Sequence, residues 1–189
     1  MPRKADAQLE SRIVDAAYQL WSRGGEHALT MRAVAREAKT TTPTLYERFR
    51  DKHDLIEFLR ARARQRMFSA LQSAKTTFEA CRLGLEFTLN NGNEYLLLTS
   101  DWAERLGRND PMPSYEFLKQ KLSEDLGGCP EEYARSALAL VSQVHGTAIL
   151  LLGEGVKAEI AKEFKVACLE ACKALIVSAG GKSTPDAKN

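Results

Sequence analysis

Apolar side chains recur along this chain at the three- and four-residue spacing of α-helices, and no segment alternates apolar and polar residues long enough for a strand. The first helical segment covers 6–23, where Ile13 and Leu20 fall on one face. Gly24 and Gly25 follow it, and glycine accepts the backbone conformation in which helices end. The pattern predicts an all-α protein whose first helix ends at this glycine pair.

Two short helices joined by a tight turn are predicted next. Thr30 is a favourable N-cap for a helix over 31–38, and Thr41 for a helix over 42–49. Pro43 falls in the first turn of the second helix, where the N–H that proline lacks would have no partner. A short helix pair of this kind, behind a longer shielding helix, is typical of a helix-turn-helix.

Longer helices follow this pair. Asp51 is expected to cap a connecting helix, with Asp54 at the acidic position of a capping box. The later predicted helices cover 68–90, 94–106, 114–126, 131–152 and 158–179. The expected organisation is a helix-turn-helix domain over 1–50, a connecting helix over 51–66, a larger ligand-binding and dimerisation bundle over 67–180, and a disordered tail over 181–189.

The last two predicted helices each carry an apolar stripe. The stripe of the helix over 158–179 consists of Ile160, Phe164, Ala167, Cys168, Ala171, Leu175 and Ile176. That of the helix over 131–152 consists of Leu138, Val141, Val144, His145, Ala148 and Leu152. Two such helices from each of two subunits would bury both stripes in a four-helix bundle, so we expect a homodimer.

The composition is that of a globular protein, with 189 residues of which 44% are hydrophobic and 28% charged. The net charge of +2 is unevenly divided. Residues 1–66 hold 14 Lys and Arg against 9 Asp and Glu, or +5, and residues 67–189 hold 13 against 16, or −3. A basic front part favours a polyanionic partner for that part alone.

No apolar stretch approaches the roughly 20 residues of a membrane helix, and the start of the chain lacks the apolar segment of a secretory signal. We therefore expect a cytoplasmic protein with no membrane partner. The four cysteines lack the paired spacing of a zinc site, so no metal or other cofactor is expected. Cys168 and Cys172 share a helix face and are either packing residues or a redox pair.

Regularly spaced arginines mark the connecting helix. They are Arg60, Arg62, Arg64 and Arg66. We interpret them as a solvated helix face, with phosphate contacts as the alternative for the first of them.

Two other classes of protein compete with a DNA-binding one. An enzyme is not expected, because no G-x-S-x-G, H-E-x-x-H or G-x-G-x-x-G motif occurs and the three histidines lack metal-ligand spacing. A helical carrier or scaffold would not need small hydroxyl side chains on a short capped helix. Thr42, Thr44 and Glu47 flank the outward side of that helix, where small residues permit close approach to DNA.

At these residues the sequence resembles the TetR family of transcriptional regulators. The matching segments are Ile13 to Ala17 with Leu20 and Trp21, Leu29 to Ala35, Thr44 to Phe49, and Lys52 to Leu55. The resemblance implies a three-helix DNA-binding domain with a connecting fourth helix, a dimer on a palindromic operator, and release of DNA when a small ligand enters the C-terminal domain. Repression is expected, and activation through the same module stays open.

The resemblance also assigns roles to single residues. Thr30, Tyr46 and Lys52 match positions that contact phosphate in the family. Thr41, Thr42 and Thr44 match positions on the family's recognition helix. The full DNA-binding set expected is Thr30, Arg32, Thr41, Thr42, Pro43, Thr44, Tyr46 and Lys52.

The chain also departs from the family pattern. Lys39 and Thr40 replace the glycine and valine of the turn, Pro43 replaces a small residue, and Arg48 replaces a histidine. Lys39 at the glycine position implies a left-handed backbone at a cost of roughly 1 kcal/mol. These departures make the operator sequence harder to anticipate.

An effector cavity is expected among the middle helices. Its expected lining is Phe87, Tyr95, Trp102, Phe117, Gln143 and His145. Aromatic walls favour an apolar or aromatic effector. The alternative for the aromatics is ordinary core packing, and for His145 a satisfied core or interface position.

Overall fold

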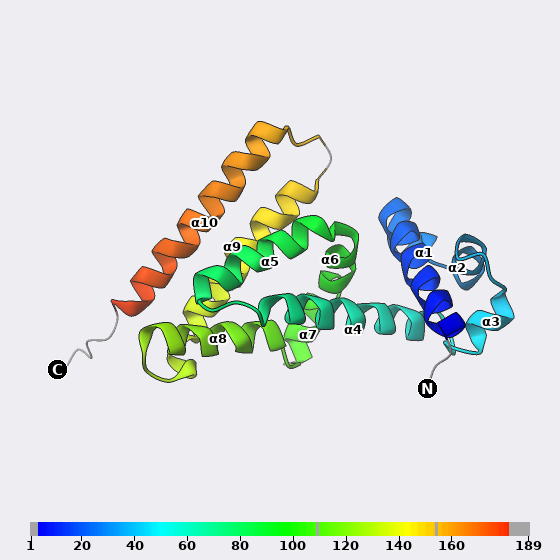
Figure 1. Ribbon diagram of the computed structural model, residues 1–189, viewed down its shortest axis with the longest axis horizontal. Helices are drawn as coiled ribbons and strands as arrows, with labels where there is room; N and C mark the ends of the chain where they lie inside the picture. Colours follow the sequence, from blue (N-terminus) through cyan, green and yellow to red (C-terminus); the bar gives the residue numbers. More distant parts are fainter. Residues whose placement is uncertain (1–3, 109, 154, 182–189) are drawn as a thin grey trace. The chain divides into compact units, whose positions relative to one another are not determined.

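A computed structural model describes residues 4–108, 110–153 and 155–181. This part of the chain is almost entirely helical and contains no strand, which confirms the predicted all-α class (Figure 1). The elements are α1 (Lys4–Ala28), α2 (Met31–Glu37), α3 (Thr42–Tyr46), α4 (Lys52–Leu71), α5 (Thr77–Asn90), α6 (Gly92–Thr99), α7 (Trp102–Arg108), α8 (Pro113–Leu126), the 3₁₀ helix η1 (Pro130–Tyr133), α9 (Ala134–Leu152) and α10 (Ala158–Gly180). The predicted disordered tail lies, from residue 182 onward, outside the described residues.

The chain divides into two compact units that are not continuous in sequence. The N-terminal unit comprises Met1–Gln65 and Gly92–Asn109, and the C-terminal unit comprises Arg66–Asn91 and Asp110–Asn189. The sequence predicted two parts that meet once along the chain, after residue 66. The segment 92–109 departs from this division because Leu97 is fully buried in the core of the N-terminal unit. A functional division at the expected boundaries stays a prediction.

The glycine pair ends the regular part of α1, as predicted. Gly24 and Gly25 have non-helical backbone angles, and the φ of Gly25 is 59°, a value that favours glycine. The chain makes one more helical turn to Ala28 before α2 begins. Thr30 caps α2 by accepting the N–H of Ala33 at its Oγ1 (3.2 Å). The predicted N-cap is thus confirmed.

The helix α3 begins where the sequence predicted and ends three residues earlier, at Tyr46 rather than Phe49. The N–H of Phe49 still donates to the carbonyl of Leu45 at 2.8 Å, so the turn continues. The next N–H, that of Arg50, donates instead to Oδ2 of Asp54 at 3.0 Å. A side-chain acceptor in the following helix therefore takes the donor that a longer α3 would need.

The core of the N-terminal unit is made by the inward faces of α1 to α4 together with Leu97 of α6. Its fully buried large side chains include Ile13, Leu29, Val34, Leu45, Leu55 and Leu59. The rings of Phe49 and Phe58 pack with centroids 5.3 Å apart. This packing holds α3 by one face and leaves its other face at the surface.

Two of the predicted long helices are interrupted. The helix predicted over 68–90 is in fact the end of α4 and the separate α5, because Thr76 caps α5 by accepting the N–H of Glu79 (3.2 Å). The N–H of Thr77 donates to Asp125 of α8 at 2.6 Å, which fixes the start of α5 within the C-terminal unit. The helix predicted over 94–106 is likewise divided into α6 and α7.

In the C-terminal unit, α9 and α10 lie side by side and both pack on α5 (Figure 1). Ala148, Cys168 and Cys172 are buried in this packing. Other members of the two predicted stripes stay at the surface of the chain: Leu138 is 49% exposed, Ile160 49% and Phe164 41%. Part of each stripe is therefore uncovered within one chain.

Among the described residues, the segment Pro130–Leu152 is by length and composition alone able to cross a membrane, and its most apolar 18 residues have a mean hydropathy of 1.3. The sequence was expected to hold no such segment, because polar residues such as Arg135, Gln143 and His145 interrupt the apolar runs of α9, yet this 19-residue helix has the required length by itself. One helix of this kind is weak support for a membrane segment, because apolar packing helices have the same composition.

Candidate nucleic-acid interface

The exposed face of α3 is the centre of the candidate interface. Oγ1 of Thr41 accepts the N–H of Thr44 (3.3 Å) and lies 2.8 Å from the hydroxyl oxygen of Thr44. Leu45 on the opposite side is fully buried, whereas Tyr46 is 53% exposed. The short helix therefore presents hydroxyl groups, Pro43 and a tyrosine to its surroundings.

The residues expected to contact DNA from α2 and α4 belong to the same unit. Thr30 and Arg32 are exposed at the start of α2, and Lys52 is half-buried at the start of α4. None of the eight predicted DNA-binding residues is buried. The structure thus places them all at the surface of the N-terminal unit, within or next to the helix-turn-helix.

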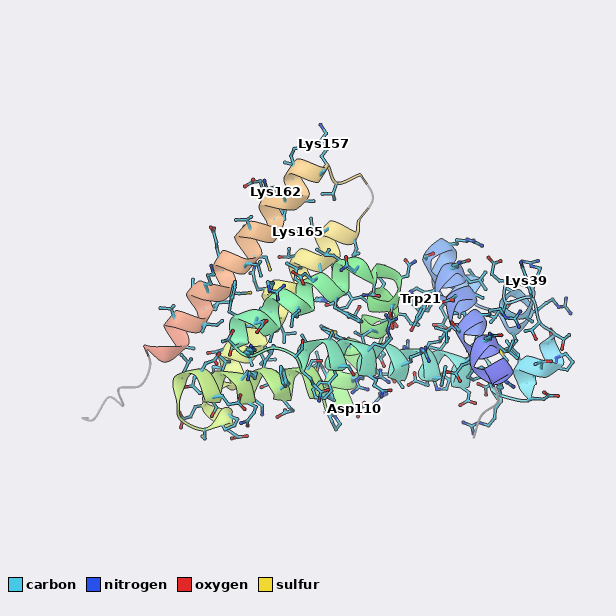
Figure 2. The ribbon with its side chains drawn as sticks, viewed as in Figure 1. Trp21, Lys39, Asp110, Lys157, Lys162 and Lys165 are labelled. Atoms are coloured by element: carbon cyan, nitrogen blue, oxygen red, sulfur yellow. The ribbon has the colours of Figure 1, made fainter. Side chains whose placement is uncertain are left out.

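The turn between α2 and α3 has the backbone that the resemblance implied. Lys39 has a φ of 52° and is exposed (Figure 2). Among the described residues other than glycine it is the only one with a positive φ. This left-handed backbone conformation destabilises the turn by about 1 kcal/mol for any residue with a Cβ.

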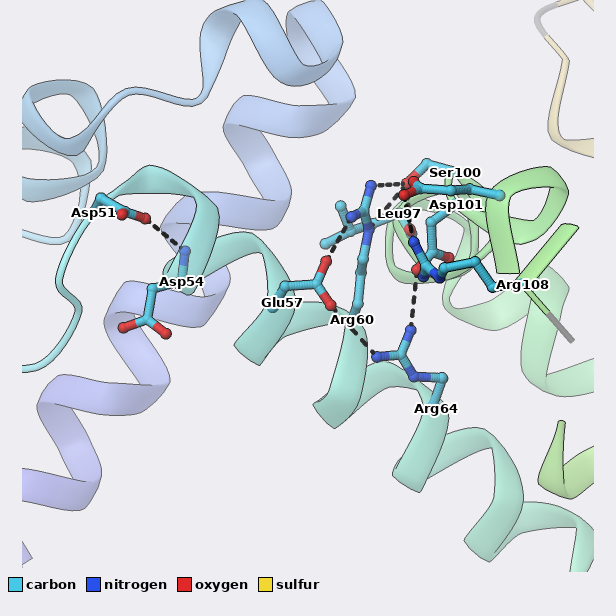
Figure 3. A network of polar contacts seen from close by, with 10 residues as sticks. Asp51, Asp54, Glu57, Arg60, Arg64, Leu97, Ser100, Asp101 and Arg108 are labelled. Atoms are coloured by element: carbon cyan, nitrogen blue, oxygen red, sulfur yellow. Dashed lines mark hydrogen bonds and ion pairs between the residues drawn. The ribbon is translucent and has the colours of Figure 1, made fainter. Parts of the chain in front are cut away.

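Asp51 and Asp54 start α4 as a modified capping box. Oδ1 of Asp51 accepts the N–H of Asp54 at 2.8 Å, as predicted (Figure 3). The carboxylate of Asp54 accepts the N–H of Arg50, one residue before the usual partner. Hydrogen bonds from the main chain and side chain of Arg50 hold the pKa of Asp54 below its ordinary value.

Lys52 has a partner within the N-terminal unit that was not expected from the sequence. Its Nζ donates to the main-chain oxygen of Glu26 at 2.7 Å and lies 3.4 Å from Oε1 of the same residue. The start of α4 is thereby joined to the short turn that follows the kink in α1. No sequence signal indicated this contact, because 26 residues separate its two ends.

The arginines of α4 in this unit are neither a purely solvated face nor free for phosphate. Arg60 donates to Glu57 (2.7 Å) and to the hydroxyl of Ser100 (2.8 Å), and Arg64 lies 3.5 Å from Asp101 (Figure 3). Burial lowers the pKa of Arg64, against the raising effect of the Asp101 carboxylate. These contacts tie the segment 92–109 to α4, and their acceptors are too distant in sequence to have been anticipated.

The six residues expected to line an effector cavity do not fall in one unit. Tyr95 and Trp102 belong to the N-terminal unit, where their rings pack edge to face with centroids 6.3 Å apart. The C-terminal unit contains the other four: Phe87, Phe117, Gln143 and His145. Tyr95 is 1% exposed, which favours the alternative of core packing for this residue.

The four residues of the C-terminal unit have mixed surroundings. Phe87 is buried, with the guanidinium of Arg66 6.0 Å from its ring centre, and Phe117 packs edge to face against Phe68. His145 is half-buried, and this burial lowers its pKa. A neutral imidazole on α9 is compatible with either of the roles considered from the sequence.

Three cysteines of the C-terminal unit are buried: Cys81 on α5, and Cys168 and Cys172 on α10. A hydrogen bond with Cys81 and burial both raise the pKa of Cys172, and burial raises that of Cys168. Protonated thiols react slowly with oxidants, so the structure favours packing over a redox pair. No group of His, Cys, Asp or Glu side chains in the described part of the chain is arranged to hold a metal ion.

Residues 13–59 match the family model described as "Bacterial regulatory proteins, tetR family". This segment is thus a TetR-type DNA-binding domain. The match covers α2, α3 and parts of α1 and α4, the same residues that form the surface described above. The TetR helix-turn-helix is a DNA-binding module of transcription regulators, and the resemblance drawn from the sequence is confirmed.

Solved structures extend the TetR likeness to the whole chain. A TetR-like transcriptional regulator from Rhodococcus sp. RHA1 is 20% identical, with a TM-score of 0.68 over 97% of this chain and 100% of its own. The TetR regulator SCO7222 from Streptomyces coelicolor is 19% identical, with a TM-score of 0.64 over 90% of this chain and 97% of its own. The TetR-family regulator PfmR from Thermus thermophilus is 17% identical, with a TM-score of 0.61 over 84% of this chain and 97% of its own. At these identities the likeness shows the fold alone. No match was found among curated protein sequences.

Proposed function

We propose that this protein is a ligand-responsive transcriptional repressor that binds a palindromic operator as a homodimer and is released by a small effector. The observation that carries the proposal is the α3 surface, where Leu45 is fully buried and Tyr46 on the other side is 53% exposed. A capped short helix held in this way by its core-facing residues is suited to enter a major groove.

The α3 surface also has the groups that a DNA backbone requires. Thr30 and Thr41 stand at helix starts, where main-chain N–H groups and hydroxyls bind phosphate. Arg32 and Lys52 add positive charge nearby, and the segment 1–66 as a whole carries +5. Arg3 and the side chain of Lys4, which contribute two of the positive charges, lie outside the described residues.

The homodimer is proposed from the uncovered apolar surface of the last two helices. Leu138 and Ile149 on α9, and Ile160 and Phe164 on α10, are between 39% and 49% exposed in the single chain. A second copy packed on both helices would bury these side chains, each at a gain of about 25 cal/mol per Å² of apolar area. The two recognition helices of such a dimer would be spaced to read two half-sites about 34–36 Å apart.

The effector is proposed to bind among the helices of the C-terminal unit. The proposed site is lined by four residues on α5, α8 and α9 of this unit: Phe87, Phe117, Gln143 and His145. Tyr95 and Trp102 are set aside because they pack together in the other unit. Two phenylalanines with one amide and one imidazole favour an apolar or aromatic effector with few polar groups.

The experiment that tests the proposal is a fluorescence anisotropy titration of the full chain with duplexes from the region upstream of its own gene. We expect tight binding to one palindromic duplex and weak binding to a scrambled duplex of equal composition. The affinity should fall steeply with salt, because phosphate contacts release counterions. Equal affinity for both duplexes at moderate salt would contradict an operator-binding function, and an enzyme or a helical scaffold would then have to be considered again.

A cytoplasmic location follows from the same proposal, since operator DNA is there. Repression and activation are distinguished by a reporter gene placed behind the selected duplex. Repression predicts higher expression when the gene for this protein is deleted, and activation predicts lower expression.

A further inference from the structure

Glu47 is an acidic side chain at the centre of a surface that otherwise suits DNA. It is the C-cap of α3, with helical backbone angles (φ −64°, ψ −22°), so it continues the outward face of that helix. It follows the buried Leu45 by two positions, which is about 200° around a helix. Glu47 therefore points away from the core and lies beside Pro43, four residues earlier, on the exposed side of the helix.

The carboxylate of Glu47 is not neutralised within the chain. The side chain is exposed, and no ion pair or side-chain hydrogen bond joins it to any of the described residues. By contrast, Glu37 on α2 lies 3.4 Å from Arg23, and Glu26 pairs with Lys52. Glu47, the one acidic residue on the exposed face of α3, therefore has no cationic partner among the described residues.

A free carboxylate at this place must either weaken DNA binding or accept hydrogen bonds from bases. Phosphates repel it, and like charges placed close together at an interface are costly. The bases offer two kinds of donor in the major groove, the N4 amino group of cytosine and the N6 amino group of adenine. On adenine the acceptor N7 lies beside the donor and opposes a carboxylate, so cytosine is the better partner.

We propose that Glu47 is a specificity-determining residue that accepts a hydrogen bond from the N4 amino group of a cytosine in each operator half-site. The inference rests on the proposed function, since it assigns a base to a helix proposed to enter the major groove. Guanine and thymine present acceptors at the corresponding place and are rejected by the charge. The residue thus contributes discrimination between sequences and little or no net affinity.

The test is a selection of duplexes from a randomised pool by the full chain, followed by affinity measurements on the selected duplex and its single-base variants. The wild type is compared with Glu47→Gln, which keeps the size and removes the charge, and with Glu47→Ala. A matched control, Glu37→Gln, removes the same charge from the same unit outside α3. Thermal unfolding of each variant checks the fold, and the exposure of Glu47 predicts no loss.

For the wild type we expect one cytosine per half-site whose replacement weakens binding on the order of tenfold. With Glu47→Gln the preference at that position should change toward adenine, since an amide pairs with N6 and N7 together. Glu47→Ala should lose the preference, and Glu37→Gln should keep it.

Two results would overturn the inference and are distinguishable. Identical base preferences for the wild type and Glu47→Gln, on duplexes that both bind tightly, would remove the role of Glu47 and leave the proposed function intact. Failure of the wild type to select any sequence would contradict the proposed function itself, and the inference with it.

Discussion

The Nζ of Lys52 donates to the main-chain oxygen of Glu26 at 2.7 Å and lies 3.4 Å from its carboxylate. The lysine expected to contact phosphate is therefore already engaged within the N-terminal unit. An ammonium group has three donors, so it is able to keep the main-chain bond and contact DNA as well. The carboxylate of Glu26, however, competes with phosphate for its charge.

This competition predicts opposite effects for substitutions of the two residues. Lys52→Met should weaken operator binding and reduce the slope of log affinity against log salt by about one per subunit. Glu26→Gln keeps the main-chain acceptor and removes the competing charge, so it should strengthen operator binding. The gain should be at most about fivefold, because an exposed ion pair contributes up to about 1 kcal/mol. Anisotropy titrations at several salt concentrations measure both effects. Lys157→Met, a lysine at the start of α10 in the other unit, is the matched control (Figure 2), and an unchanged slope for Lys52→Met would argue against the contact.

Tyr46 provides a test of the α3 surface itself. Tyr46→Phe removes only the hydroxyl, and a hydrogen bond to a charged group contributes about 1.5–3 kcal/mol, so operator affinity should fall by roughly tenfold or more. Tyr46→Ala should weaken binding further through loss of the ring. Because the side chain is 53% exposed, both variants should fold and dimerise normally in sedimentation experiments. A folded Tyr46→Phe with wild-type affinity would remove the phosphate contact.

The left-handed backbone at Lys39 predicts a gain in stability on substitution by glycine. Its φ of 52° is disfavoured for any side chain with a Cβ, so Lys39→Gly should raise the free energy of unfolding by about 1 kcal/mol. Lys39→Ala keeps the Cβ, loses the same charge, and should give no such gain. Urea unfolding followed by circular dichroism measures the difference. Equal stability of the two variants would show that the turn relaxes at no cost.

Phe164 tests the proposed dimer. Phe164→Asp places a charge on the uncovered stripe of α10 and should produce monomers at micromolar concentration in sedimentation velocity. Val166→Asp is the control, because Val166 is similarly exposed, at 44%, but lies about 200° around the helix from Phe164. An unchanged dimer for Phe164→Asp, or equal dissociation by both variants, would contradict the proposed interface.

The local elements of the fold could be predicted because their causes lie close together in the sequence. Thr30, Thr41 and Asp51 each receive an N–H from three residues ahead, as capping requires. The kink at Gly25 was likewise predictable, because glycine accepts a positive φ, and so was the positive φ of Lys39, because this residue stands where the family has glycine. The DNA-binding surface is built from such local features.

The features that were missed depend on partners far along the chain. The arginines of α4 were interpreted by their spacing alone, whereas the partners of Arg62 and Arg64 are Glu10 and Asp101. The interruption before α5 is reinforced by Asp125, 48 residues away from Thr77. Periodicity describes which face of a helix is apolar, and it carries no information about which segment will cover that face.

The burial of Leu97 among the helices of the N-terminal unit has a consequence for how this protein is made and engineered. A nascent chain that ends before residue 97 lacks one side chain of this core, so the DNA-binding half reaches its full stability only after the chain extends past that residue. A graft that cuts the chain at residue 65 would leave behind a leucine that fills the core, and removal of such a side chain costs about 2–5 kcal/mol. Swapping regulatory halves between relatives therefore requires the transfer of 92–109 together with 1–65.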